Sequence, residues 1–452
     1  GLILERVNGR YYENGLLKLG GKLKALKDAD PEHTFVVTAG DLWQGSLESN
    51  DNKGALITEA TNYIGFDAYT IGNHELDYGV DAFLENVEKA NYPFLGNNVV
   101  NYHTREHWDK LENSVIIQRG GAKIGIIGSI GQGQTTSITS TYVQDLDFID
   151  PFGISFNEAK RLKEVEGCQI VLSIIHEGAN TAKSGYRFYE NVNKYIDGVM
   201  CGHTHYPEEE RYDGVPYIQA ACNGEYYSHI EVELQNGVVV RRQGEVCDVD
   251  SSWPEDQGIQ AIMDKYLDAD FKEKSTEVLG TLKNGSLSKY EVANLGAKAM
   301  YEWVKTQPEN YNIAFAGENS QRAEINQGEF NYSDLYKATP FINKIVIMKA
   351  SGDEIYRQAK NIYTYTGDKS YYELDKNKVY TFAIIDYHAY HQNVSKRYDY
   401  WYELNSHPEW VLHEYNITPS DASAWFIKDI LQGNVNSNDY ETFSTGMNVY
   451  KK

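Results

Sequence analysis

Short apolar runs alternate with amphipathic stretches along the first half of the chain. Apolar runs of four to eight residues bounded by turn residues are typical of buried strands, and apolar positions at helical spacing predict helices between them. We predict strands at 34–38, 68–71, 123–127, 169–175 and 198–201, and helices at 55–64, 80–90 and 155–166. This alternation is typical of an α/β layered sheet.

The pattern of strands and helices is interrupted at residues 248–257. Strands are predicted at 216–220, 229–234 and 237–241, the last two joined by a turn at Gln235-Asn236, before Asp, Ser, Pro and Gly interrupt the pattern at 248–257. An amphipathic helix is predicted at 259–271, followed by a helix at 290–305 and strands at 312–316, 345–349 and 379–385. We therefore predict a first domain at 1–250, a linker helix within 251–275 and a second domain at 276–452.

Composition and charge exclude several classes of protein. The chain has 452 residues, of which 24% are charged and 13% are aromatic. This aromatic content is too much apolar surface for wholesale disorder. Its net charge of −23, without a compensating basic cluster, argues against duplex nucleic acid as a partner. No apolar run approaches the roughly 20 residues of a membrane span. A small phosphate substrate would need bound cations to reverse the local field.

Candidate ligands for such cations follow directly after predicted strands. These motifs are Gly40-Asp41, Gly72-Asn73-His74-Glu75, His176 and Gly202-His203-Thr204-His205. Each alone is weak, because Gly-Asp and Gly-Asn are common turns and a lone histidine is often a core residue. In an open α/β sheet, however, the loops at the carboxyl ends of strands converge on a ligand. The four motifs together therefore predict a metal site.

The residue types suit phosphoester hydrolysis. Asp41 could bridge two cations, while imidazoles hold borderline divalent metals and Asn73 offers both a carbonyl oxygen and an amide donor. Two such metals could activate a water and neutralise charge on the phosphoryl oxygens. Zn, Mn, Co, Fe and Mg all fit the ligand types, so the metal identity stays open.

His74 lies next to a candidate ligand and is free to assist the leaving oxygen. Asp77, three residues further on, could fix the tautomer of His74. The alternative is that Asp77 caps the helix predicted to start near Val80.

These motifs resemble the calcineurin-like metallophosphoesterases, specifically the two-domain bacterial 5'-nucleotidase, UDP-sugar hydrolase and 2',3'-cyclic nucleotide phosphodiesterase branch. The resemblance rests on the runs 40–45, 72–79 and 202–205. It implies a four-layer α/β/β/α sandwich followed by an α+β substrate domain. It also implies two metals, one held by Asp41, Asn73, His176 and His203, the other by Asp41, His205 and an Asp-x-His motif, with His74 and Asp77 as the catalytic pair.

The Asp-x-His motif is not present in the chain, which begins with residues that resemble those just after it. We expect the missing ligands to lie upstream of Gly1. The alternative is that the metal site is incomplete, and that the chain is a non-catalytic binding protein with at most one metal.

The second domain resembles the family's substrate-specificity domain more faintly, at 293–297, 332–336 and 339–343. The stretches 317–322 and 386–391 depart from the family pattern. Arg322 could grip an anionic group and Asn343 belongs to a matching stretch, while Tyr387 and Tyr390 could stack on a base. The alternatives are a surface salt bridge for Arg322 and ordinary packing for the tyrosines.

The resemblance therefore implies a secreted, periplasmic or cell-surface phosphoester hydrolase. A 5'-nucleotidase that releases phosphate from nucleotides through a metal-activated water fits best. A 2',3'-cyclic nucleotide phosphodiesterase, a UDP-sugar hydrolase or a non-catalytic binding protein on the same scaffold are the alternatives.

Overall fold

The computed structural model describes residues 4–7, 10–13, 15–319, 321–358, 362–367, 373–390, 408–440 and 449–451. The chain divides into two compact units. The first consists of residues 1–44, 48–138 and 142–266, and the second of residues 45–47, 139–141 and 267–452.

The first unit alternates strands and helices along most of its length. Its elements are β1 (Leu4–Val7), β2 (Arg10–Glu13), η1 (Gly15–Gly20), α1 (Gly21–Ala29), β3 (Val37–Thr38), α2 (Leu47–Asn50), α3 (Ala55–Ile64), β4 (Ala68–Thr70), η2 (His74–Leu76), α4 (Val80–Lys89), β5 (Phe94–Leu95), β6 (Val99–Asn101), β7 (Ser114–Arg119), β8 (Ala122–Ile130), η3 (Gln132–Ser137), β9 (Leu146–Phe148), α5 (Pro151–Glu164), β10 (Ile170–His176), α6 (Ala179–Tyr186), α7 (Val192–Tyr195), β11 (Gly198–Cys201), β12 (Glu208–Tyr212), β13 (Val215–Gln219), β14 (Tyr226–Gln235), β15 (Val238–Asp248) and α8 (Gln257–Tyr266). The short helix η4 (Ser140–Tyr142) has its first two residues in the second unit and its last in the first, and the first residue of α2 also belongs to the second unit.

A six-stranded sheet in the order β12-β13-β11-β10-β8-β7 forms the centre of this unit. The four strands β8, β10, β11 and β13 run parallel, which fits their buried, β-branched sequences. A three-stranded parallel sheet, β3-β4-β5, and the β14–β15 hairpin form separate sheets.

Side chains of β10 alternate between two cores. Val171 and Ile175 pack with residues of α5, α6 and α7, whereas Leu172 and Ile174 pack with Ala68 of β4 and with residues of β14. This period of two places one helical layer on one face of the central sheet and strands on the other.

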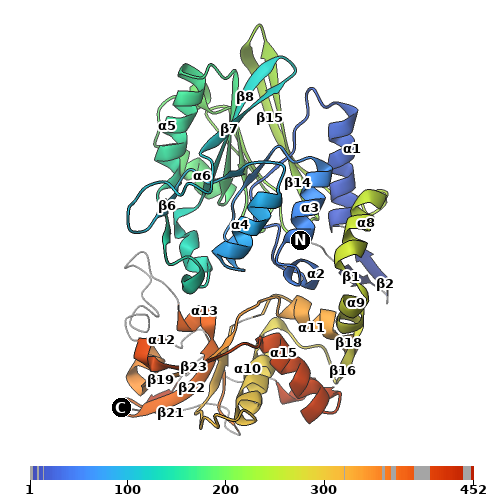
Figure 1. The fold of residues 1–452 in the computed structure, drawn as a ribbon, viewed down its shortest axis with the longest axis vertical. Coiled ribbons are helices and arrows are strands. Elements are labelled where there is room, and N and C mark those ends of the chain that lie inside the picture. Colours follow the sequence, from blue (N-terminus) through green and yellow to red (C-terminus); the bar gives the residue numbers. More distant parts are fainter. Residues whose placement is uncertain are drawn as a thin grey trace. The chain divides into compact units, whose positions relative to one another are not determined.

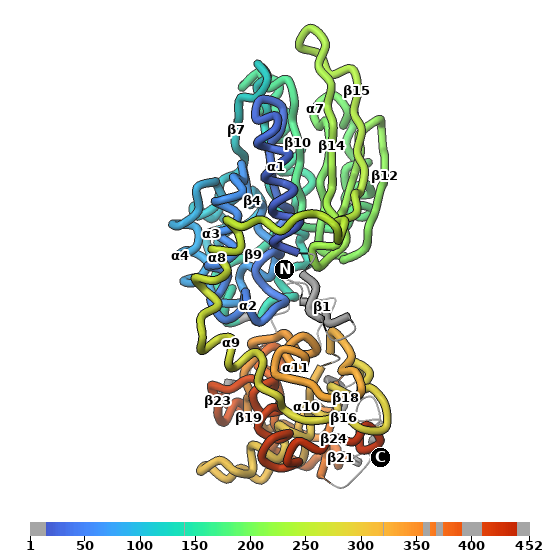
Figure 2. The backbone as a smooth tube through the Cα atoms, turned by 90° about the vertical axis from the view of Figure 1, so that its right-hand side faces the viewer, coloured from blue at the N-terminus to red at the C-terminus, as the bar shows by residue number. Residues whose placement is uncertain are grey.

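A second helical layer covers the outer face of β3-β4-β5. Tyr69 of β4 and Phe94 of β5 pack with Trp43 and with Phe83 of α4. Figure 1 shows α5 and α6 on one side of the strands and α3 and α4 on the other, and Figure 2 shows the β14–β15 hairpin beside β12. The four-layer sandwich expected for the first domain is confirmed.

The predicted single helix at 259–271 is wrong. Two helices occupy this region, α8 in the first unit and α9 (Ala269–Thr276) in the second. The side chain of Asp268 accepts a hydrogen bond from Phe271 N and starts a new helix there. Ile259 is buried in the first unit and Phe271 in the second, so the amphipathic pattern serves two different cores.

The second unit mixes helices with sheets of two, three and five strands. Besides α9, its elements are β16 (Val278–Lys283), α10 (Lys289–Lys305), β17 (Ala316–Glu318), β18 (Gly328–Asn331), α11 (Tyr332–Ala338), β19 (Ile345–Ser351), α12 (Gly352–Gln358), β20 (Tyr363–Tyr365), β21 (Glu373–Asp375), β22 (Val379–Ile385), α13 (Asp386–Ala389), η5 (Pro408–Trp410), β23 (Val411–Tyr415), α15 (Pro419–Trp425), η6 (Phe426–Ile430), β24 (Asn434–Asn436), η7 (Ser437–Asp439) and β25 (Val449–Lys451).

The main sheet of this unit, β20-β17-β22-β19-β23, has a core on each face. The predicted strand at 312–316 is wrong in its bounds, because β17 starts only at Ala316. Ala314 N donates to Thr381 O and Phe315 O accepts from Ala383 N, so this segment runs beside β22 before the regular pairing begins. None of the helices in the described part of the chain has the length and apolar character that a membrane crossing needs.

Candidate metal centre

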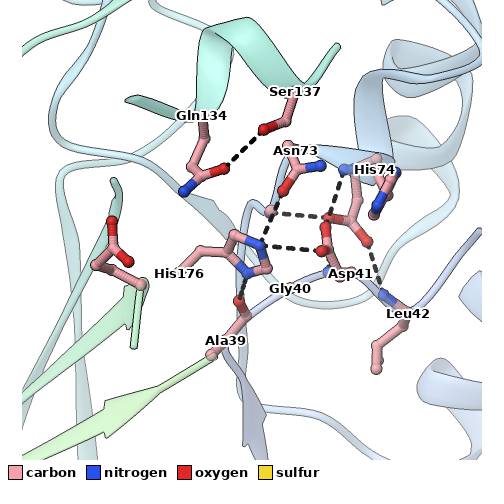
Figure 3. Close-up of polar contacts among 12 residues, drawn as sticks. Ala39, Gly40, Asp41, Leu42, Asn73, His74, Gln134, Ser137 and His176 are labelled. Atoms are coloured by element: carbon pink, nitrogen blue, oxygen red, sulfur yellow. Dashed lines mark hydrogen bonds and ion pairs between the residues drawn. The ribbon is translucent and has the colours of Figure 1, made fainter. Parts of the chain in front are cut away.

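Strand register brings the candidate ligands to one edge of the first unit. In the parallel pairs, Ile130 of β8 lies opposite His176 of β10, Ile175 opposite Cys201 of β11, and Cys201 opposite Gln219 of β13. The loops that follow these strands therefore start at the same level. The loops after β3 and β4, which carry Asp41 and Asn73, reach the same place (Figure 3).

Tight turns present these ligands. Asp41, His203 and His205 have φ of 60°, 80° and 66°, a left-handed conformation that non-glycine residues rarely adopt. Gly40 and Gly72 pack closely beside Asp41, because a Cβ atom on Gly40 would lie 2.3 Å from Gly72 N and one on Gly72 would lie 2.3 Å from Asp41 Oδ1. Such strained backbone at ligand positions is common at functional sites.

Three side chains bring ligand atoms within 4.8 Å of one another, those of Asp41, His176 and His203. His176 Nδ1 lies 2.6 Å from the carbonyl oxygen of Ala39, which can only accept, so Nδ1 carries a proton. His176 Nε2 then faces two further acceptors, Asp41 Oδ2 at 3.0 Å and Asn73 Oδ1 at 3.1 Å. If the His176 ring were neutral, the lone pairs of its Nε2, of Asp41 Oδ2 and of Asn73 Oδ1 would point at one another. This arrangement therefore requires a cation between these atoms, either a second proton or a metal ion. The donor set fits a divalent metal.

Electrostatics within the group agree with this interpretation. Burial opposes ionisation of Asp41, yet His176 and His74 hold the pKa of Asp41 well below its usual range. Burial by itself would lower the pKa of His176, but the Asp41 carboxylate raises it overall. Burial, together with His176, lowers the pKa of His203 to about 4, so that the His203 ring is neutral at physiological pH, the form that can bind a metal.

His205 differs from the other histidines of the group. It is exposed on the same loop, two residues beyond His203, and is not among the three side chains whose ligand atoms converge. Its role as a ligand of a second metal therefore stays a proposal. The Asp-x-His ligands that the resemblance implies are not among the described residues.

His74 and Asp77 form the expected pair. His74 Nδ1 lies 2.6 Å from Asp77 Oδ2, and the backbone N–H of His74 donates to Asp41 Oδ1 at 2.9 Å. Because the carboxylate accepts, His74 Nδ1 carries the proton and Nε2 is the ring atom that can face a substrate. Asp77 does not cap α4, whose N-cap is Gly79 without a side-chain hydrogen bond.

Glu75 is a residue beside the ligand group whose contacts the sequence did not predict. This fully buried carboxylate accepts hydrogen bonds from the backbone N–H groups of Asp41, Leu42 and Gly72 and from the hydroxyl of Tyr69, at 2.6 to 2.9 Å. Four donors around one carboxylate fix the loop that carries Asp41. The only sequence signal was an acidic residue inside the motif 72–75, next to a predicted buried strand.

Gln219 has the same function for the histidine loop and was also missed. Its side chain is buried at the end of β13, and Nε2 donates to Thr204 Oγ1 and to the carbonyl oxygen of Tyr206. These bonds hold the residues on either side of His205, and Thr204 directly follows His203. No feature of the local sequence distinguishes this glutamine from an ordinary strand residue.

Replacing Glu75 by glutamine is expected to weaken metal binding by about ten-fold to a hundred-fold, as for other residues that orient metal ligands. The glutamine NH2 group would face N–H donors of the Asp41 loop, and each buried group left without a partner costs about 1 to 3 kcal/mol. Calorimetric titration with Mn2+ measures the affinity, with Glu32→Gln as the exposed control. Unchanged Mn2+ affinity in Glu75→Gln would show that the loop holds its geometry without this carboxylate.

The four candidate substrate residues of the second unit have different environments. Arg322 is exposed, with its guanidinium carbon 5.1 Å from the centre of the Phe341 ring. Asn343 Nδ2 donates to Asp386 Oδ1 at 2.7 Å. Tyr387 and Tyr390 pack against the two different cores of the main sheet, and the hydroxyl of Tyr390 donates to Glu414. Ser320 and His391, which belong to the two altered stretches, lie outside the described residues.

Glu318 of the same unit gives a pH-dependent prediction. Burial raises its pKa from 4.5 to about 7, although the N–H of Asn319 opposes the rise. The folded state therefore binds the proton more tightly than the unfolded state, so this group stabilises below about pH 4.5 and the stabilisation is lost as the pH rises towards 7. Glu318→Gln is expected to match the wild type near pH 4.5 and to exceed it by about 1 to 3 kcal/mol at pH 8.

Calorimetric unfolding of both proteins across this pH range tests the prediction, with the exposed Glu324→Gln as control. A stability difference that does not change with pH would contradict it.

The comparisons with known proteins agree with the fold and the site. Residues 14–207 match the calcineurin-like phosphoesterase family, and residues 274–368 match the 5'-nucleotidase C-terminal domain. An apyrase of Tabanus yao is 27% identical over 374 residues, which cover 75% of this chain and 66% of that protein. A 5'-nucleotidase of Vibrio vulnificus (strain CMCP6) is 21% identical over 406 residues, 77% of this chain and 72% of that protein. The chain thus spans about two thirds of the length of these relatives.

A solved structure has the same fold over almost the whole chain. The 5'-nucleotidase precursor from Thermus thermophilus aligns with a TM-score of 0.74 and 17% identity, covering 95% of this chain and 94% of that one. Together, fold and ligand group define a metallophosphoesterase. More particularly, the chain has a calcineurin-like phosphoesterase domain followed by a 5'-nucleotidase C-terminal domain.

Proposed function

We propose that the chain is a metal-dependent 5'-nucleotidase that releases phosphate from nucleoside 5'-monophosphates. The observation that carries this proposal is the group of His176 Nε2, Asp41 Oδ2 and Asn73 Oδ1, whose lone pairs converge and require a cation. Divalent metals bound there would activate a water and neutralise charge on the phosphoryl group. The names of the relatives, apyrase and 5'-nucleotidase, support a nucleotide as substrate.

Side chains of the first unit would bind the metals, the phosphoryl group and the leaving oxygen. Asp41, Asn73, His176 and His203 hold the first metal, and Asp41 and His205 contribute to a second. The buried Nδ2 of Asn73, which has no hydrogen-bond partner among the described residues, is available to a phosphoryl oxygen. His74 Nε2 stabilises the leaving oxygen, and Asp77 holds the His74 ring through Nδ1.

The substrate could instead be a different phosphoester. Asn343 donates to Asp386, and Tyr387 and Tyr390 pack against the two cores of the main sheet, which favours a changed mode of base recognition in the second unit. A 2',3'-cyclic nucleotide and a UDP-sugar are the candidates. By the same family resemblance we propose that the chain acts outside the cytoplasm, as a secreted, periplasmic or cell-surface enzyme of nucleotide catabolism.

A substrate panel tests these proposals. Hydrolysis is measured with AMP, 2',3'-cyclic AMP, UDP-glucose and an aryl phosphate, each with Mn2+ or Zn2+ and with or without chelator. Inorganic phosphate is the product followed for AMP and the aryl phosphate, and the nucleoside monophosphate is the product followed for 2',3'-cyclic AMP and UDP-glucose. We expect metal-dependent release that is fastest with AMP. Faster hydrolysis of another compound of the panel would reassign the substrate. No hydrolysis of any of the four compounds would contradict the proposal that the chain is an enzyme. Elemental analysis that finds two metals per chain would support the dinuclear site, and one metal or none would contradict it.

A further inference from the structure

The loop after β8 carries polar side chains that none of the roles above uses. It forms η3, directly after Gly131. The backbone N–H of Gly131 donates to the carbonyl oxygen of His176 at 3.0 Å, so the loop is tied to the strand that carries a metal ligand. Its residues therefore keep a fixed position relative to the metal centre.

Gln134 is the residue of this loop that faces the centre. It is 7% exposed, and Figure 3 shows its side chain extending from η3 toward the group of Asp41, Asn73 and His176. Its backbone N–H donates to Gly131 O, and its Oε1 accepts a hydrogen bond from Ser137 Oγ, both at 3.1 Å. The oxygen is thereby held by Ser137, which leaves Nε2 as the other end of the amide.

The other half of the Gln134 amide is not used. Within the described part of the chain its Nε2 makes no hydrogen bond, although the side chain is held in place through Oε1. A donor in a largely buried side chain is satisfied by a protein group, by water or by a ligand. Phosphoryl oxygens only accept hydrogen bonds, and at this centre the neighbouring Asp41 is a carboxylate that repels them. A fixed, neutral donor is therefore suited to a phosphoryl group.

We propose that Gln134 is a further substrate-binding residue, whose Nε2 donates a hydrogen bond to a non-bridging phosphoryl oxygen. This inference rests on the proposed function and deepens it. Gln134 approaches from the loop after β8 and Asn73 from the loop after β4, so two amide donors from different loops contact the phosphoryl group. Ser137 acts as a positioning residue, because its hydroxyl fixes which end of the Gln134 amide is free.

Affinity for inorganic phosphate, the product of 5'-nucleotide hydrolysis, tests the proposal independently of turnover. Calorimetric titration of the Mn2+-loaded full chain compares wild type with Gln134→Met and Gln134→Glu. The methionine keeps the volume and removes the donor. The glutamate keeps an acceptor for Ser137 and replaces the donor by a negative charge. Gln132→Met, at an exposed position of the same η3, is the matched control.

We expect phosphate affinity to fall about ten-fold or more in Gln134→Met, because a hydrogen bond to a charged group is lost, and further in Gln134→Glu. Mn2+ affinity and thermal stability should stay near the wild-type values, and Gln132→Met should bind phosphate normally. Equal phosphate affinity in wild type and both Gln134 variants, or no phosphate binding by the wild type, would overturn the inference. The substrate panel tests the proposed function separately. If the wild type hydrolyses AMP while the Gln134 variants bind phosphate as tightly as the wild type, the inference about Gln134 is wrong but the proposed function is not.

Discussion

Replacing Asp41 by asparagine is expected to abolish binding of the first metal and to lower phosphate release by about a thousand-fold or more. Asp41 supplies the only negative charge to the converging ligand group, and its Oδ2 lies 3.0 Å from His176 Nε2. Asparagine keeps the shape and the acceptor for His74 N–H but loses that charge. Metal ions contribute several kcal/mol to such transition states, which corresponds to the stated loss in rate.

Elemental analysis and Mn2+ titration of Asp41→Asn, beside its rate of phosphate release, measure both effects. Asp30→Asn is a matched control, because Asp30 is an exposed aspartate paired with a histidine, His33. It should bind metal and release phosphate as the wild type does. If Asp41→Asn retained full metal content and activity, the assignment of the metal centre would be wrong.

Replacing His74 by alanine is expected to lower kcat by about a hundred-fold to ten-thousand-fold while metal binding persists. His74 contributes no atom to the ligand group, but its ring is oriented by Asp77 at 2.6 Å and its backbone N–H binds Asp41. The backbone contact survives the substitution, so the metal site should stay intact. Asp77→Asn, which disturbs only the orientation of the ring, should cost less than His74→Ala.

The effect of His74→Ala should depend on how easily the leaving group departs. An aryl phosphate with an acidic phenol leaves without a proton, whereas the 5'-oxygen of a nucleoside needs one. His74→Ala should therefore lose much more activity on AMP than on the aryl phosphate. The exposed His33→Ala should lose activity on neither. Equal losses on both substrates would exclude His74 as the group that assists departure.

The sequence predicted that Asp41, His176 and His203 lie close together, because His176 and His203 follow mostly buried strands and Asp41 follows β3. The helix at 55–64 and the strand at 379–385 have the predicted bounds in the structure. Where strands are this clear, the rule that parallel strands end at one edge places side chains from 41, 73, 176 and 203 together without any knowledge of the loops.

The supporting residues could not be predicted in this way. Glu75, Gln134 and Gln219 act through hydrogen bonds to backbone groups or side chains of their surroundings, and nothing in their local sequence marks such partners. The break between α8 and α9 was missed for a related reason, since one amphipathic pattern served two cores. Likewise, Tyr387 and Tyr390 are three residues apart, yet they pack on different faces of their sheet.

Metal dependence of AMP hydrolysis is the most direct test of the central claim. The purified chain is stripped of metal with chelator, and phosphate release from AMP is followed as Mn2+ is added back, with Asp41→Asn measured in parallel. The account predicts no release from the stripped protein, recovery that follows Mn2+ occupancy, and no recovery in Asp41→Asn. Full activity in the stripped protein, or equal recovery in Asp41→Asn, would contradict it.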